Sequence, residues 1–303
     1  MNKVVIVGCG NVGMSYAYAI VTRKLNVDEI VLIDINKEKA EGEALDLSHA
    51  CACTGRHIKI KAGSYKECDN ATIVCIAAGR NQEVGETRTD LIEKNYHVFK
   101  SIISEINKTK FKGIYLVATN PLDVMTYITK KLSGFPANKV IGSGTTLDTA
   151  RLKYLISEKL NINSREVHAY VIGEHGDTEF IPWKNALIGP NNVDCFLTAN
   201  EMNEILVDVR NSAYEIIAKK GNTAYGIGMC LEDISRAIIN NEKSIFTVSA
   251  YNRKHDVYFG IPTVLGSKGA EKSLFFELTP KEENQLLESI NRIKENVKSI
   301  EDK

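Results

Sequence analysis

Short apolar runs rich in valine and isoleucine recur along the first half of the chain, each followed by a polar turn and a segment with helical periodicity. These runs are expected to be strands at residues 3–8, 30–33, 58–62, 71–77, 114–118 and 140–141. Strands that are apolar on both faces are typical of a parallel sheet covered by helices on both sides. The pattern therefore predicts an α/β domain with a doubly wound parallel sheet over residues 1–143.

The alternation of strands and helices becomes less regular from residue 144 onward. Helices are expected over 198–220 and 229–240, and an amphipathic helix from 281 to the end. Strands are expected near 244–250 and 257–261, where apolar and β-branched residues cluster. This order predicts a second, mixed α/β domain over residues 144–303.

Composition and charge narrow the class of protein. The 303 residues include 38 basic and 38 acidic side chains, with 44% hydrophobic and 25% charged residues. This balance is typical of a globular protein and indicates no nucleic-acid-binding surface. No apolar run is long enough to cross a bilayer, so no membrane partner is expected. An apolar strand begins almost at once, which leaves no room for a signal peptide.

The seven cysteines are scattered mostly among apolar residues. An odd number in such positions favours reduced thiols and a cytoplasmic location. Cys51 and Cys53 form a close pair, but no second cluster completes a four-ligand site. No metal site is therefore expected.

A glycine-rich turn follows the first predicted strand. Gly8, Gly10 and Gly13 form the pattern G-x-G-x-x-G between that strand and a helix. The first glycine permits a tight turn, the second lets a pyrophosphate approach the backbone, and the third lets helix and strand pack closely. Asp34 ends the second strand, where a carboxylate would bind the adenosine ribose and repel a 2′-phosphate. These features predict a Rossmann dinucleotide-binding domain that prefers NAD; the alternative is a glycine turn and a capping aspartate without a ligand.

Residues 79–89 interrupt the pattern with two glycines, many charges and a single apolar residue. Composition alone favours a solvated surface loop. Because the segment follows a central strand, at the edge where open α/β sheets bind ligands, we also consider a lid that brings Gln82 and Arg88 to a substrate. Asn120 also follows a strand, in an Asn-Pro turn whose isomer the sequence leaves open.

An apolar segment ends in a polar turn with glycines on both sides of His175. Histidine is the side chain whose ordinary pKa suits it to give and take a proton near neutral pH. A lone histidine would more often be a structural turn residue. However, Asp148 and Arg151 lie upstream at a spacing of three, which places them on one face of a predicted helix. An aspartate to orient the histidine and an arginine to bind a carboxylate would form a site for a small acid.

Taken in order along nearly the whole chain, these motifs resemble the lactate/malate dehydrogenase family. The resemblance rests on the glycine turn, Asp34 and the segments 81–88, 118–121, 147–151 and 173–177. It implies that His175 donates and accepts the proton, that Asp148 orients it and that Arg151 binds the substrate carboxylate. It implies further contacts with substrate from Arg88, Gln82, Asn120 and Thr223. The cofactor neighbours that it implies are Gly8, Gly10, Val12, Gly13, Asp34, Lys39, Tyr65, Gly79, Asn120 and Ser143.

The residue at position 82 separates substrates within this family. Lactate enzymes tend to hold glutamine there, and malate enzymes hold arginine. An amide provides no counter-charge for the second carboxylate of oxaloacetate, so Gln82 favours pyruvate and L-lactate. The alternatives within the family are malate or a branched-chain 2-hydroxy acid. Outside it, we weigh an NAD-dependent glycosidase, which would need metal ligands, and a non-catalytic NAD-binding protein.

The resemblance also implies a homotetramer and raises the question of an effector. Allosteric bacterial relatives bind fructose 1,6-bisphosphate between subunits through an arginine and a histidine. His168 matches this histidine, whereas the arginine position holds Lys153. Lysine attracts phosphate as a point charge without a two-pronged fork, so we expect a weaker response. The alternative for His168 is an ordinary strand histidine.

Overall fold

The computed structural model describes residues 1–80 and 88–301, without the side chains of residues 88, 89 and 301. Its helices and strands follow one another as β1 (Lys3–Val7), α1 (Asn11–Thr22), β2 (Glu29–Ile33), α2 (Lys37–Cys53), β3 (Lys59–Ala62), β4 (Ile73–Ile76), α3 (Arg88–Asn107), β5 (Ile114–Val117), α4 (Leu122–Ser133), β6 (Val140–Gly142), α5 (Thr146–Leu160), β7 (Val167–His168), β8 (Leu187–Ile188), β9 (Asn191–Asn192), α6 (Ala199–Lys220), α7 (Tyr225–Ile239), β10 (Ser244–Asn252), β11 (Val257–Gly266), β12 (Gly269–Ser273) and α8 (Pro280–Glu301).

The first six strands form the parallel sheet that the sequence predicts. Their spatial order is β6-β5-β4-β1-β2-β3, and β1 pairs in parallel with both β2 and β4. Every residue of β1, β2, β4, β5 and β6 is buried, which explains their continuous apolar runs. The chain reverses its direction of winding between β1 and β4. Open α/β sheets bind ligands beyond the carboxyl ends of the strands at such a point.

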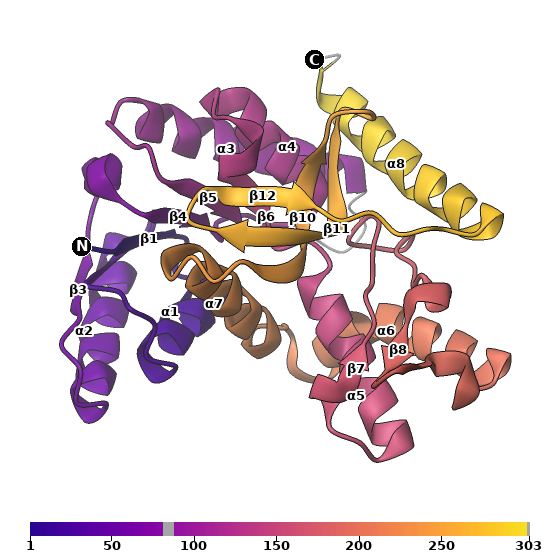
Figure 1. Ribbon diagram of the computed structural model, residues 1–303. Coiled ribbons are helices and arrows are strands. Elements are labelled where there is room, and N and C mark those ends of the chain that lie inside the picture. The colour runs from indigo at the N-terminus through magenta and orange to yellow at the C-terminus, as the bar shows by residue number, and fades with distance from the viewer. Residues whose placement is uncertain (81–87, 302–303) are drawn as a thin grey trace.

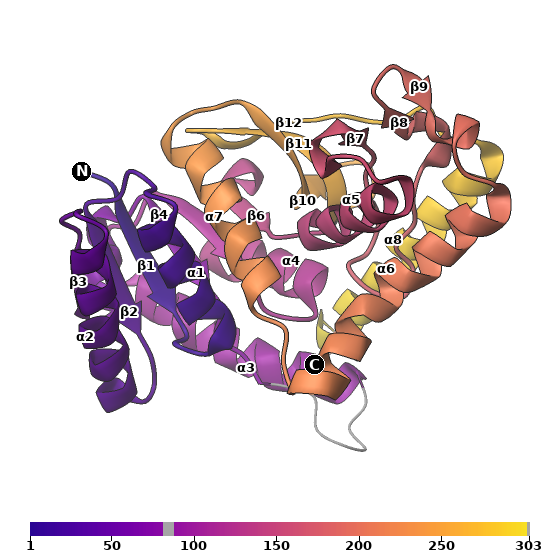
Figure 2. The ribbon, with the colours of Figure 1, turned by 90° about the horizontal axis from the view of Figure 1, so that it is seen from below.

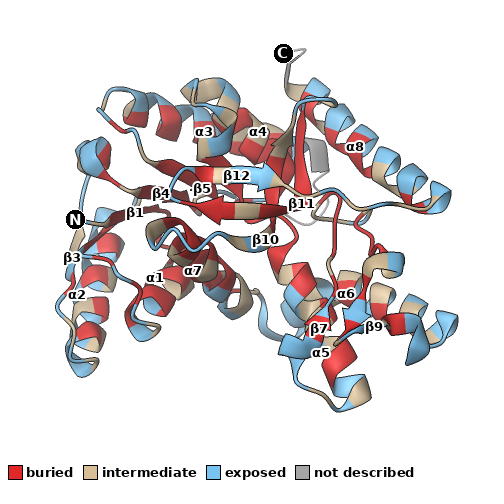
Figure 3. Ribbon diagram, in the orientation of Figure 1, coloured by how far each residue is buried: buried red, intermediate tan, exposed pale blue. Residues whose placement is uncertain are grey.

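Helices cover both faces of the sheet (Figure 1). Helices α1, α2 and α7 lie on one side, and α3, α4 and α8 lie on the other. Along these helices, the stretches that face the sheet are largely buried, and the stretches that face outward are largely exposed (Figure 3). Asn36 caps α2 by accepting a hydrogen bond from the Lys39 N–H at 3.0 Å.

The second half of the chain extends the same sheet. Strands β10, β11 and β12 form an antiparallel meander that joins β6 through the pair Ser249 and Gly142, so the sheet has nine strands. A Cβ atom at Gly142 would lie 2.8 Å from the Cβ of Ser249, so glycine permits this close pairing. Sequence periodicity predicted strands in this region but not their partner, because the partner of a strand is set by tertiary contacts.

A smaller unit packs beside this sheet. It consists of α5, α6 and the short sheet β7-β8-β9 (Figure 2). Its own apolar core includes Leu152, Val167 and Val209. Val171 belongs to this second core, and two residues later Gly173 pairs with Gly260 of β11. The turn that carries His175 therefore begins where the chain passes between the two cores.

The Asn120–Pro121 peptide bond, which the sequence left open, is cis. Among the described residues, no helix is both long enough and apolar enough to span a bilayer.

Candidate active site

The glycine turn between β1 and α1 forms a backbone cradle. A Cβ at Gly13 would lie 2.0 Å from the carbonyl oxygen of Gly8, and a Cβ at Gly8 would lie 2.6 Å from the Ala78 nitrogen. Both positions therefore require glycine for close packing. A Cβ at Gly10 would meet nothing within 4 Å. Gly10 precedes α1 and provides no side-chain cap, so the first N–H groups of the helix remain available to a phosphate.

Asp34 follows β2 and is tied to this cradle. Its carboxylate accepts hydrogen bonds from the Cys9 N–H at 2.7 Å and from the Asn36 N–H at 2.9 Å. The side chain predicted to bind the ribose thus also holds the glycine turn in place. The charge of Asp34 lies beside the glycine turn, which fits NAD without a 2′-phosphate.

The remaining predicted cofactor neighbours lie at the same edge of the sheet. Each follows the carboxyl end of a parallel strand within the next few residues. Ser143 is buried, Val12 and Tyr65 are half-buried, and Lys39 and Gly79 are exposed. Burial raises the pKa of the Tyr65 phenol to about 12, so this side chain is neutral.

Three side chains form the candidate catalytic group. Asp148 and Arg151 lie one turn apart on α5, and Arg151 Nη1 donates to Asp148 Oδ1 at 2.8 Å. The other carboxylate oxygen, Oδ2, lies 2.6 Å from Nδ1 of His175. Asp148 is buried and His175 is half-buried. With Nδ1–H donating to the ionised aspartate, Nε2 is left to exchange a proton with a ligand.

The main chain around His175 is held on several sides. Gly173 exchanges two backbone hydrogen bonds with Gly260 of β11, at 3.0 and 2.8 Å. The Glu174 N–H donates to the Ser289 hydroxyl of α8 at 3.2 Å. A Cβ at Gly173, where φ is +98°, would lie 2.6 Å from that same hydroxyl oxygen. The glycine in this motif is therefore required both by backbone conformation and by space.

The surroundings of His175 favour its charged form. Burial lowers its pKa, but the neighbouring Asp148 carboxylate outweighs this effect, with smaller contributions from Glu179 and Asp123. The pKa of His175 is raised to about 9. Burial raises the pKa of Asp148, but the contacts with His175 and Arg151 are stronger, and its pKa is lowered. The pair is an imidazolium and a carboxylate at neutral pH.

Two family models together match nearly the whole chain. The lactate/malate dehydrogenase NAD-binding domain matches residues 2–142, and the lactate/malate dehydrogenase alpha/beta C-terminal domain matches residues 145–303. The chain belongs to the lactate/malate dehydrogenase family. The family resemblance predicted from the motifs is confirmed.

Individual members of the family are similar over their full length. L-lactate dehydrogenase 2 of Bacillus anthracis is 45% identical over 99% of this chain and 98% of that protein. A lactate dehydrogenase from a deep-sea metagenome library has a TM-score of 0.95 and 46% identity, covering 98% of both chains. The ligand-bound minor L-lactate dehydrogenase of Enterococcus mundtii has a TM-score of 0.96 and 40% identity, covering 99% of this chain and 98% of that one.

The structure describes only some of the other substrate residues that the family resemblance implies. Asn120 is exposed at the carboxyl end of β5, and Thr223 is half-buried in the connection between α6 and α7. Gln82 and the side chain of Arg88 lie outside the described residues, although α3 begins at Arg88. Their contacts with a substrate stay predictions.

Lys153 and His168, the predicted anion-site residues, lie in the smaller unit formed by α5, α6 and the sheet β7-β8-β9. Lys153 of α5 is half-buried, with Nζ 5.8 Å from the centre of the Tyr170 ring, and burial lowers its pKa. His168 of β7 is exposed, and burial alternates from residue 167 to 171. Such alternation places His168 and Tyr170 on the same face of this segment.

The structure adds two side chains that sequence analysis did not identify. Glu179 is buried, and burial followed by the nearby Asp148 charge raises its pKa well above the ordinary value. Asn95 of α3 is fully buried. Its Oδ1 accepts from the Arg80 N–H at 2.8 Å, and its Nδ2 donates to the Asn120 carbonyl at 2.8 Å. Both lie outside the recognised motifs, and only the fold brings them to the site.

Asp148, His175 and Glu179 also place three potential metal-ligand atoms within 4.8 Å of one another. However, both oxygens of Asp148 are already engaged, one by His175 and the other by the Arg151 guanidinium. A cation would have to break the ion pair and approach a fixed positive charge. The arrangement therefore fits an acid–base pair better than a metal centre.

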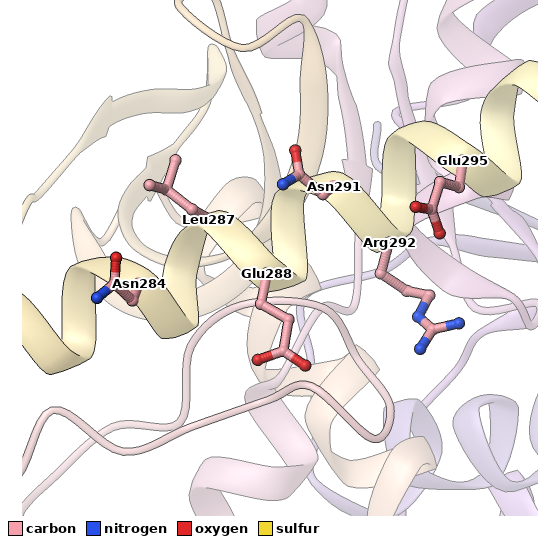
Figure 4. A pocket seen from close by; sticks show the side chains of 6 residues that line it. All are labelled: Asn284, Leu287, Glu288, Asn291, Arg292 and Glu295. Carbon is pink, nitrogen blue, oxygen red and sulfur yellow. The ribbon is translucent and has the colours of Figure 1, made fainter.

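Two hollows lie away from this group. One, of about 380 Å³, runs along the outer face of α8 and is lined by exposed side chains including Leu287, Glu288 and Arg292 (Figure 4). The other, of about 460 Å³, lies on α3 beside Asp90 and His97. Neither contains a residue of the cradle or of the catalytic group, so the site is assigned from its hydrogen bonds and not from these hollows.

Proposed function

We propose that the protein is an NAD-dependent L-lactate dehydrogenase that interconverts pyruvate and L-lactate. The observation that carries this proposal is the buried Asp148 carboxylate, which bridges His175 and Arg151. One carboxylate thereby orients a proton donor and a group that can bind the substrate carboxylate. Full-length relatives that are 45% identical and named L-lactate dehydrogenase support it.

His175 acts as the general acid in pyruvate reduction. Its ring is protonated below about pH 9, with Nδ1–H directed to Asp148 and Nε2–H free for the carbonyl oxygen of pyruvate. When bound, the nicotinamide of NADH supplies the hydride to the keto carbon. As negative charge develops on the carbonyl oxygen, the imidazolium stabilises it and transfers its proton. In lactate oxidation the neutral imidazole takes this proton back.

Arginine side chains orient and polarise the substrate. The Arg151 guanidinium can form a two-pronged pair with the substrate carboxylate. We assign Arg88 to the carbonyl oxygen and Gln82 to the methyl end of pyruvate. Asn120 and Thr223 would lie beside the nicotinamide and the substrate.

A direct assay tests the activity and the substrate. Purified protein with NADH should reduce pyruvate with a higher kcat/KM than either oxaloacetate or a branched 2-keto acid. His175→Asn serves as the control, because it removes the proton donor while the cradle still binds NADH. Preference for oxaloacetate would identify a malate enzyme, and NADH binding without turnover of any keto acid would contradict a dehydrogenase function.

We also propose that the chain assembles as a homotetramer in the cytoplasm. Large apolar side chains are exposed on several helices, as expected where a second subunit packs; on α1, α5, α6 and α7 they include Tyr18, Tyr154, Val207, Ile217, Tyr225 and Met229. All seven cysteines are free thiols, which fits a reducing compartment. Lys153 and His168 would form an anion site for fructose 1,6-bisphosphate at a subunit boundary.

A further inference from the structure

Asp123 contacts the main chain of the turn that carries the catalytic histidine. It lies in the first turn of α4, three residues after Asn120, and is almost completely buried. Its Oδ2 accepts a hydrogen bond from the main-chain N–H of His175 at 2.8 Å. Its Oδ1 accepts a hydrogen bond from the Ser249 hydroxyl of β10 at 2.5 Å. One side chain therefore joins the Asn120 turn, the His175 turn and the strand that extends the sheet.

We propose that Asp123 is a positioning residue for the reaction, whose carboxylate fixes the main chain of His175 relative to the Asn120 turn. This inference rests on the proposed dehydrogenase function. In that function the Asn120 turn would lie beside the nicotinamide, and His175 would have to deliver its proton to an atom held there. Because proton transfer requires heavy atoms about 3 Å apart, a small shift of either turn would slow it.

The buried environment of Asp123 makes its ionised carboxylate unfavourable for the stability of the fold. Burial raises its pKa to about 6, although the hydrogen bonds from Ser249 and from the His175 N–H oppose this shift. Its folded pKa lies above its ordinary value, so the ionised carboxylate destabilises the fold as pH rises through about 6. A neutral amide of the same shape would still accept from the His175 N–H without this cost, and its NH₂ could donate to the Ser249 hydroxyl. The hydrogen bonds alone therefore do not require the negative charge.

The charge of Asp123 acts on the histidine ring as well as on its backbone. The acidic side chains that face His175 are Asp148, Glu179 and Asp123, and when ionised all three raise its pKa. The groups that face Asp123 are His175, which lowers its pKa, and Glu174, which raises it. Asp123 thus holds the histidine in place and favours its protonated form.

Two substitutions separate the hydrogen bond from the charge. In Asp123→Asn the amide oxygen can still accept from the His175 N–H, while its NH₂ donates to Ser249, whose hydroxyl can also accept. In Asp123→Ala the His175 N–H loses its acceptor. Thr129→Val is the matched control, because Thr129 is a buried polar residue of the same helix whose hydroxyl donates to the Met125 carbonyl of that helix.

The Asp123→Asn variant tests the charge. We expect a melting temperature at pH 8 equal to or above that of the wild type, and a KM for NADH within about twofold. The pH at which pyruvate reduction declines on the alkaline side should fall by roughly half a unit, because one negative charge beside the ring is lost. Thr129→Val should leave this pH unchanged.

The Asp123→Ala variant tests the hydrogen bond. We expect kcat to fall roughly ten- to a hundredfold with NADH affinity within about twofold, because the proton donor is displaced while the cradle is intact. A wild-type kcat in a folded Asp123→Ala protein would overturn the inference. If that variant does not fold, an unchanged alkaline limb in Asp123→Asn overturns it. A wild-type protein that binds NADH but reduces no keto acid would instead overturn the proposed function, and this inference with it.

Discussion

Nδ1 of His175 and Oδ2 of Asp148 lie 2.6 Å apart, and the aspartate is almost completely buried. Because little water screens the pair, each charge strongly stabilises the other. The proton on the imidazole is therefore held far more tightly than in a free histidine. The raised pKa of His175 contributes stability that is fully present below about pH 6.5 and is lost as pH rises through about 9.

Asp148→Asn should remove most of this effect. Without the carboxylate, burial lowers the pKa of His175 toward or below its ordinary value of about 6.5. The alkaline decline of pyruvate reduction should move from near pH 9 down by about two units, and kcat at pH 8 should fall about a hundredfold or more. Binding of NADH, followed by its fluorescence, should change little. An unchanged pH profile would contradict the pairing.

The glycine turn allows a comparison between two equivalent substitutions. Gly10→Ala should fold normally, because the new methyl group meets no atom of the chain, yet it should bind NADH much more weakly because that space is kept for the pyrophosphate. Gly13→Ala should lower the melting temperature, because its methyl group would collide with the Gly8 carbonyl. Thermal melts and NADH titrations distinguish the two, and normal NADH affinity in Gly10→Ala would argue against the cradle.

Cofactor choice should depend on Asp34. In Asp34→Ser the repulsion of a 2′-phosphate is lost, so the ratio of kcat/KM for NADPH to that for NADH should rise by about tenfold or more. Activity with NADH should also fall, because Cys9 and Asn36 lose an acceptor. The ratio is thus the informative quantity. If it does not change, another group sets the preference.

Substrate choice should respond to Gln82. Gln82→Arg supplies a counter-charge for the second carboxylate of oxaloacetate, so the preference should shift from pyruvate toward oxaloacetate by about tenfold or more. Gln82→Lys provides a comparison, since it adds the charge without the two-pronged geometry and should shift less. If the wild type, Gln82→Arg and Gln82→Lys all show the same ratio of kcat/KM for pyruvate to that for oxaloacetate, residue 82 does not set the substrate choice.

Regulation should depend on Lys153 and His168. Fructose 1,6-bisphosphate, added at pH 6, should lower the KM for pyruvate and raise the oligomer mass. A lower pKa of Lys153 and the lack of an arginine fork both predict a weak effect. Lys153→Ala should abolish it. No response at pH 6 would mean that the site does not bind this ligand.

Much of the fold followed from local patterns. The buried parallel strands were predicted because each contains a continuous apolar run, and the helices because their apolar positions recur at helical spacing. The pair Asp148 and Arg151 could be placed on one helix face by spacing alone. Its contact with His175 was implied by the family resemblance, and the structure brings the two side chains together.

Other features could not be read from local sequence. Asn95, Asp123 and Glu179 act through partners that are distant along the chain; for Asp123 the partners are His175 and Ser249. Nothing in the neighbouring residues distinguishes such a buried polar side chain from an ordinary helix position. Likewise, the residue pattern of a strand predicts that the strand is buried but not which strand lies beside it.

The pairing of β6 with β10 has a consequence for dissection of the chain. A fragment ending near residue 143 would keep the glycine turn and Asp34 but would leave one side of β6 with unpaired backbone groups and no cover from β10. An uncovered apolar edge of this kind invites pairing with other chains and aggregation. The nucleotide-binding half should therefore be insoluble when expressed alone, and regain solubility when residues 244–273 are supplied as a second polypeptide.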